Sequence, residues 1–132
     1  MKHDSDTPPI VELALQEDVG PGDWTTIWTV PEDRRATAKI VAKAFGTVAG
    51  CEAALATFRR VDDRLDIEVN APDATAVERG DPVMRVRGSA RSILTAERVA
   101  LNLLQRLSGV ATLTRAFVDA IVKVPGAESP IR

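Results

Sequence analysis

Apolar residues recur along this chain with two spacings, one typical of helices and the other typical of strands. Spacing of three and four residues predicts helices at Ile10–Asp18 and Cys51–Val61, each with one apolar face. Alternation of apolar with polar or small residues is the period of a half-buried strand. We expect strands at Ala36–Phe45, around Val48, at Leu65–Val69 and at Pro82–Val86.

Turn-forming residues set the ends of the first helix. Thr7 is a possible N-cap, and the helix is predicted to stop at the Gly-Pro-Gly sequence of residues 20–22. Asp23, Thr25 and Thr26 follow directly, and their side chains suit a tight turn because they can bond nearby backbone N–H groups. We therefore expect a turn rather than a helix after residue 22.

The last third of the chain predicts two helices, Ser89–Leu107 and Ala111–Val124, with a break at Ser108-Gly109. The full order is then helix, strand pair, helix, strand pair and two helices. This order lacks the regular strand-helix-strand alternation of a parallel sheet. It predicts an α+β fold with an open, largely antiparallel sheet and flanking helices.

The length of the chain fits one domain, or one domain and the beginning of another. With 132 residues, 45% of them hydrophobic and 27% charged, it can bury a core without disulfides or metal. We divide it into a flexible N-terminal arm at 1–9, an α+β domain at 10–109 that its long helix closes, and a linker helix at 110–132.

Charge and cysteine content restrict the partners and the compartment. The net charge of −2 gives no overall attraction to nucleic acid or to an anionic membrane, and we expect neither as a partner. No apolar run approaches the roughly 18 residues that a membrane span needs. Cys51, the single cysteine, cannot form an internal disulfide, which favours a cytoplasmic location.

The segment Ser92–Thr112 places two adjacent charges in a helix that is otherwise mostly apolar. On a helical projection one stripe contains Ile93, Leu94, Ala100, Leu101, Leu104 and Leu107. Glu97 falls inside this stripe and Arg98 falls at its edge, where a long side chain can pack its stem against apolar neighbours while its head faces a cleft. We expect Glu97 to be a buried acceptor that orients Arg98 or a nearby backbone group, and the helix to be covered on two sides.

Three segments of the chain resemble one enzyme family in the same order. They are ALQEDVGPGDWTT at Ala14–Thr26, AKAFGTVAGCEAALATF at Ala42–Phe58, and TAERVALNLLQRLSGVAT at Thr95–Thr112. Together they resemble the N-terminal half of the quinolinate phosphoribosyltransferases, the carboxylating nicotinate-nucleotide pyrophosphorylases of NAD biosynthesis. The last segment is the most specific of the three.

The resemblance implies a two-domain enzyme in which an α+β N-terminal domain precedes an incomplete α/β barrel. Such an enzyme transfers phosphoribosyl from phosphoribosyl pyrophosphate to quinolinate, with Mg²⁺, and releases pyrophosphate and CO2 to give nicotinate mononucleotide. The resemblance also implies a homodimer or a larger homo-oligomer, because the N-terminal domain of one subunit closes the barrel of its neighbour.

The resemblance assigns Arg98 to substrate binding, with Glu97 in support. A planar guanidinium can bind a carboxylate through two parallel hydrogen bonds, and quinolinate has two carboxylates. No catalytic residue and no metal ligand is expected in this chain, because the family's TRKT segment, histidine-arginine pair, lysines and Mg²⁺-associated acids belong to the barrel. A smaller departure is Asp73-Ala74, where relatives usually have Asp-Gly. We expect no turnover from the chain alone.

Two alternatives remain open. One is a related enzyme with another substrate, such as the paralogue associated with molybdate transport genes or a nicotinate phosphoribosyltransferase; the ERVALN run favours quinolinate. The other is a noncatalytic module that binds a partner subunit. Whether the coding frame continues past Arg132 into a barrel distinguishes this module from the enzyme.

For several other residues we favour a structural interpretation over a functional one. Glu17, Asp18 and Asp23 could form a metal cluster, but capping of the helix end and turn is favoured. Cys51 is expected to be a buried thiol. Arg59, Arg60 and Arg64 suit a solvated face, and Asn102, Gln105 and Ser108 suit polar packing between domains. Arg85, Arg87 and Arg91 could add positive potential at a phosphate site, but here too the structural interpretation is favoured.

Overall fold

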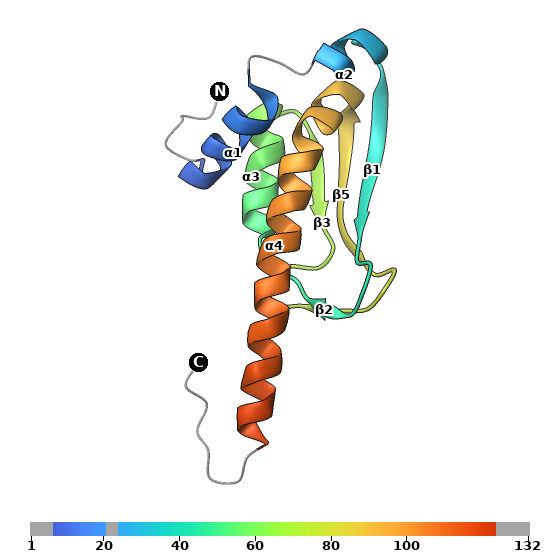
Figure 1. The fold of residues 1–132 in the computed structure, drawn as a ribbon. Coiled ribbons are helices and arrows are strands. Elements are labelled where there is room, and N and C mark those ends of the chain that lie inside the picture. Colours follow the sequence, from blue (N-terminus) through green and yellow to red (C-terminus); the bar gives the residue numbers. More distant parts are fainter. Residues whose placement is uncertain (1–6, 21–23, 124–132) are drawn as a thin grey trace.

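The computed structural model describes residues 7–20 and 24–123 of the chain, and its path is drawn in Figure 1. The elements are α1 (Pro9–Val19), α2 (Trp24–Thr29), β1 (Arg35–Val41), β2 (Gly46–Thr47), α3 (Cys51–Val61), β3 (Asp66–Val69), β4 (Ala76–Val77), β5 (Pro82–Ser89) and α4 (Ala90–Val122). Residues 1–6 of the predicted arm, Asp23 of the predicted turn and residues 124–132 of the predicted linker lie outside the described ranges.

The sheet is antiparallel and lies open on one face. Its three strands have the order β1-β5-β3, and β2 pairs with β4 in a separate two-stranded ribbon. In Figure 1, α1, α3 and α4 lie together on one side of the three strands. The predicted α+β class, with an open antiparallel sheet and flanking helices, is confirmed.

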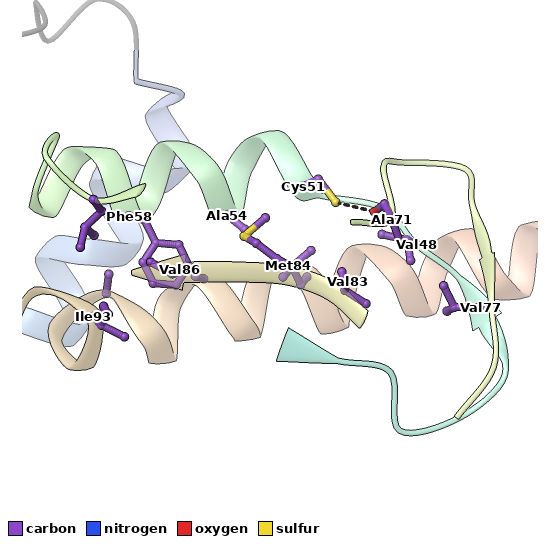
Figure 2. Close-up of a cluster of buried hydrophobic side chains, with 14 residues drawn as sticks. Val48, Cys51, Ala54, Phe58, Ala71, Val77, Val83, Met84, Val86 and Ile93 are labelled. Atoms are coloured by element: carbon purple, nitrogen blue, oxygen red, sulfur yellow. Dashed lines mark hydrogen bonds between the residues drawn. The ribbon is translucent and has the colours of Figure 1, made fainter. Parts of the chain in front are cut away.

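The core fills the space between β5 and the two helices α3 and α4. Met84 and Val86, two residues apart on β5, are 1% and 0% exposed and point to the same face. Phe58 of α3 and Ile93 of α4 lie beside them in Figure 2. Because these side chains come from three elements, their burial fixes α4 against the sheet. It thereby also fixes where each residue of α4 lies relative to the strands.

The predicted break at Ser108-Gly109 is wrong, because α4 runs without interruption over 33 residues. A glycine inside a helix costs only about 1 kcal/mol relative to alanine, which is too little to end a helix that is held elsewhere. Ser108 supplies part of that hold, since its Oγ donates to the carbonyl of Ala49 at 3.1 Å and accepts from the N–H of Ala49 at 3.0 Å.

The stripe predicted on α4 is right for four of its six residues. Ile93, Ala100 and Leu104 are buried and Leu101 is half-buried, whereas Leu94 and Leu107 are exposed. Val99, which lies off that stripe, is also buried. The helix is therefore covered on two sides, as expected, because α1 packs against it as well as α3 and the sheet.

The ends of α1 and the segment after it also differ from expectation. Thr7 is not the cap of α1: the N-cap position is Pro8, without a side-chain hydrogen bond. Thr25 and Thr26 lie in α2 rather than in a tight turn, and the hydroxyl of Thr29 donates to the carbonyl of Thr25 at 2.7 Å. A helix of six residues is too short for apolar periodicity to predict.

Three strands also have bounds other than those predicted. The first strand ends at Val41, four residues before Phe45, and the strand expected around Val48 is Gly46–Thr47. The strand predicted at Pro82–Val86 continues to Ser89, where the turn into α4 begins. The two residues of β4 were not predicted, because a strand of that length has no measurable alternation.

Candidate functional site

Arg98 projects from the first third of α4 toward the end of α1. Its Nη1 donates to Oδ1 of Asp18 at 3.4 Å, a distance at the long end for such a bond. The Arg98 side chain is 82% exposed, whereas the Asp18 side chain is 25% exposed. The guanidinium is therefore held by one nitrogen and faces outward with the others.

Asp18 reaches Arg98 because α1 is anchored at its beginning. Val11 is fully buried, and Glu12 forms an ion pair with Arg60 of α3. The helix continues for two turns from there to Asp18 and ends at Gly20, whose N–H bonds the carbonyl of Gln16. The two residues of the pair thus come from segments separated by 80 positions in the sequence.

A cavity of about 580 Å³ surrounds this pair. It is lined by Ala14, Glu17, Asp18, Arg98, Val99, Leu101, Asn102 and Gln105. Among these, two carboxylates oppose one guanidinium, so the cavity alone has a net charge of −1. Such a surface does not retain a dianion without further cations, although the exposed donors of Arg98 suit a carboxylate.

Glu97 faces another cavity, and the expectation that it is buried and orients Arg98 is wrong. Its side chain is half-buried, and it has no hydrogen bond or ion pair within the described ranges. Adjacent residues of a helix point about 100° apart, which is why the two neighbours lie on different flanks of α4. The Glu97 cavity has about 450 Å³ and lies between α4, β1 and the residues that follow β1.

The second half of α4 is held against β2 by side chains of α4 that bond the backbone of β2 and of the residues after it. Thr112 Oγ1 accepts from the N–H of Thr47 at 2.9 Å, next to the Ser108 bonds to Ala49. At Gly46 an added Cβ would lie 2.8 Å from Oγ1 of Thr112, so only glycine lets the two backbones approach this closely. Ser108 therefore packs within this domain, whereas polar packing between domains was expected.

A buried carboxylate joins the end of α3 to the start of α4. Asp62 accepts from the N–H and Nε of Arg64 at 3.0 and 2.9 Å, and from Oγ of Ser92 at 2.8 Å. Its side chain is only 6% exposed. The bonded Arg64 guanidinium, against the opposing effect of burial and with help from Ser92, lowers the pKa of Asp62.

A second carboxylate caps the start of α3. Asp73 accepts from the N–H groups of Gly50 and Cys51 at 3.2 and 2.9 Å. Burial opposes ionisation of Asp73, but these two N–H bonds outweigh it and lower its pKa. Ala74, the departure from Asp-Gly noted in the sequence, has φ +72°, a left-handed conformation that favours glycine.

Cys51 is a buried thiol, as expected. Its Sγ donates to the carbonyl of Ala71 at 3.3 Å, the dashed contact in Figure 2. Burial, together with the nearby Asp73 carboxylate, raises the pKa of the Cys51 thiol to about 12. A thiol with this pKa stays protonated at neutral pH and is a poor nucleophile.

The remaining basic residues belong to local structure. Arg85 and Arg87 lie on the same side of β5, as predicted, and Arg85 is 3.9 Å from Glu68 of the neighbouring strand. Arg91 donates to the carbonyls of Val30 and Ile27, which are at the end of α2. Arg85 and Arg91 thus have partners within the domain.

Asp18 was expected to cap the end of α1. The structure shows instead that Asp18 pairs with Arg98.

Within residues 7–20 and 24–123, no three side chains of the histidine, cysteine, aspartate or glutamate types form a group that could hold a metal ion. Nor does any helix in this part of the chain combine the length and apolar character needed to cross a membrane.

Comparison with known proteins connects this domain to one family. Residues 23–108 match the family model described as quinolinate phosphoribosyl transferase, N-terminal domain. A relative from Oryza sativa subsp. japonica, called nicotinate-nucleotide pyrophosphorylase (carboxylating), chloroplastic, is 44% identical over 116 residues, which cover 87% of this chain and 31% of that protein.

Two solved structures have the same fold. NadC from Streptococcus pyogenes has a TM-score of 0.81 at 36% identity and is matched over 86% of this chain and 40% of its own. The nicotinate-nucleotide pyrophosphorylase from Francisella tularensis has a TM-score of 0.81 at 33% identity, over 86% of this chain and 41% of its own.

The open sheet with helices on one face is thus the N-terminal domain of a phosphoribosyl transferase. The chain belongs to the quinolinate phosphoribosyl transferase family. It spans about a third of the rice relative's length and about two fifths of each of the two crystal structures.

Proposed function

We propose that this chain is the substrate-capping part of a quinolinate phosphoribosyltransferase. The complete enzyme converts quinolinate and phosphoribosyl pyrophosphate to nicotinate mononucleotide, pyrophosphate and CO2 in NAD biosynthesis. The names of the relatives support this reaction, and the observation that carries it is the Arg98 guanidinium, four-fifths exposed in a cavity on the domain surface.

In this proposal Arg98 binds a carboxylate of quinolinate and orients its ring. A guanidinium stays protonated in proteins, so Arg98 holds the substrate and transfers no proton. The cavity has a net negative charge, and the cations that complete a dicarboxylate site come from the barrel of a second subunit. The enzyme is accordingly a homodimer or a larger homo-oligomer, and we place it in the cytoplasm.

The Mg²⁺ of the reaction is assigned to the barrel as well. The described residues do not fit a magnesium site: no suitable group of ligands occurs among them, and Asp18 is already bonded to Arg98. The chain therefore contributes substrate orientation, while phosphoribosyl chemistry belongs to residues outside it.

The test uses a chimera in which residues 7–123 replace the matching segment of the Francisella tularensis enzyme. We expect the chimera to form nicotinate mononucleotide from quinolinate and the 132-residue chain alone to form none. A chimera that uses nicotinate instead of quinolinate would support the paralogue. Turnover by the chain alone would contradict the proposal.

Reading the gene past the codon for Arg132 separates the enzyme from the noncatalytic alternative. We expect the frame to continue into a barrel that contains a TRKT segment. A stop codon there, with a purified chain that remains a stable monomer, would favour the subunit-binding module.

A further inference from the structure

Arg98 has two edges through which it can bind a carboxylate with two parallel bonds. One edge presents Nη1 and Nη2, and the other presents Nε and Nη2. Asp18 bonds Nη1 alone, and this prevents a second carboxylate from binding the Nη1–Nη2 edge with two bonds. Nε and Nη2 have no partner within the described ranges, so the second edge is open.

The two members of the pair differ in how firmly they are fixed. Asp18 is at the end of a helix whose other end is anchored by fully buried Val11 and by the Glu12–Arg60 ion pair. Its side chain is three-quarters covered, whereas Arg98 extends into solvent on a long flexible side chain. In such a pair the covered partner sets the geometry and the exposed partner adopts it.

From this geometry we propose that Asp18 is a positioning residue, which holds Nη1 of Arg98 so that the Nε–Nη2 edge faces the carboxylate of the substrate. This inference rests on the proposed function of Arg98 and adds a residue from α1 to the site. Asp18 itself does not contact the substrate in this arrangement. The bond is long and exposed, which sets the expected effect at a few-fold.

Glu17 is the matched control for Asp18. It precedes Asp18 in α1, is exposed, lines the same cavity and has no bond to Arg98. Glu17→Ala therefore removes the same charge from the same cavity without removing the contact. If only the negative charge at the helix end mattered, the KM for quinolinate would change alike in Asp18→Ala and Glu17→Ala. If Asp18 positions Arg98, KM rises only in Asp18→Ala.

The first measurement uses the kinetics of the chimera described above. Asp18→Ala should raise the KM for quinolinate about fivefold with little change in kcat, since exposed pairs contribute at this scale. Asp18→Asn, which keeps an oxygen acceptor, should raise it by about twofold. Glu17→Ala should not raise it, because removing a carboxylate from the cavity lessens the repulsion of the dianion. In the Arg98→Ala background, Asp18→Ala should have no effect on KM.

The outcomes separate this inference from the function on which it rests. If Arg98→Ala leaves the KM for quinolinate unchanged, the proposed function of Arg98 fails. If Arg98→Ala raises KM but Asp18→Ala does not, or if Glu17→Ala raises it equally, only the positioning role fails.

A second measurement needs no turnover. In the ¹⁵N-labelled 132-residue chain, the Nε–H order parameter of Arg98 should fall in Asp18→Ala and remain unchanged in Glu17→Ala. An Arg98 signal that is equally mobile in the unmodified chain and in Asp18→Ala would overturn the inference.

Discussion

Two carboxylate–guanidinium pairs that contact α4 differ in how deeply the carboxylate is buried and in how completely it is bonded. At the start of α4, the carboxylate of Asp62 is buried and accepts bonds from Arg64 and from Ser92. Two turns further on, the side chain of Asp18 is 25% exposed and bonds Arg98 once, at 3.4 Å. The guanidinium is exposed in both pairs, so the carboxylates make the difference.

The difference separates a structural pair from a pair that is available to a ligand. Removing Asp62 leaves the half-buried hydroxyl of Ser92 without its acceptor, and that desolvation cost falls on folding. Removing Asp18 leaves Arg98 in water, where a lost surface pair costs very little. Stability should therefore depend on the first pair, and ligand binding on the second.

The largest effect on stability is expected for Asp62→Ala. It should lower the free energy of unfolding of the chain by about 3 kcal/mol, because the hydrogen bonds that Arg64 and Ser92 donate to a buried charge are lost. Urea denaturation measures this change. Asp18→Ala is the control and should alter stability by less than about 0.5 kcal/mol. Equal losses in the two variants would remove the distinction between the pairs.

Gly50→Ala should destabilise the chain by about 2 kcal/mol, since the change overpacks a tight contact. Gly50 has φ +95°, and a Cβ there would lie 2.8 Å from Cδ1 of Leu107 on α4. Gly109→Ala is the matched control, because a Cβ at Gly109 meets nothing within 4 Å and alanine favours the helix. Thermal unfolding should show a lower Tm for the first variant and a slightly higher Tm for the second.

The contribution of Asp62 should also depend on pH. Arg64, opposed by burial and helped by Ser92, lowers the pKa of folded Asp62, so its stabilisation is present above the pKa of the unfolded carboxyl, about 3.9. It is lost as pH falls through the lower folded pKa. The difference in unfolding free energy between the unmodified chain and Asp62→Asn should therefore be constant from about pH 5 to 7 and shrink below about pH 4. A difference that grows on acidification would contradict this sign.

A smaller effect, of opposite sign, is expected at Ala74, which follows the carboxylate that caps α3, Asp73. Ala74→Gly should stabilise the chain by about 1 kcal/mol, because alanine is strained at positive φ and glycine is not. The midpoint of urea denaturation should rise with no change in its slope. A lower midpoint would mean that the side chain of Ala74 contributes more than its strained backbone costs.

The sequence predicted the elements that have long apolar patterns. The helices α1 and α3 lie within one residue of their predicted bounds, since eleven residues give about three turns of periodicity. The two-residue strands β2 and β4 offer no such pattern. The continuity of α4 through Gly109 depends on the Ser108 and Thr112 bonds to a loop about 60 positions earlier, which local propensity does not contain.

The candidate site was predictable in part. Arg98 stood out as a charge at the edge of an apolar stripe, with its head expected to face a cleft, and the structure places it, 82% exposed, in the cavity that Asp18 also lines. Its partner was assigned to Glu97, the nearest acid in the sequence, although neighbouring helical residues diverge. Asp18 is 80 positions away and could be found only from the packing of α1 on α4. One signal for Asp18 was present in the sequence: it lies in Ala14–Thr26, one of the three segments that resemble the family.

The most direct test of the account compares Arg98→Ala and Arg98→Lys in the chimera with quinolinate as the varied substrate. We predict that kcat/KM falls at least about thirtyfold in Arg98→Ala, the equivalent of a lost charged hydrogen bond. Arg98→Lys should recover little of it, because an ammonium lacks the two-pronged geometry. The unfolding free energy should stay within about 0.5 kcal/mol in both variants. Unchanged kcat/KM in Arg98→Ala would contradict the assignment of this side chain to the substrate.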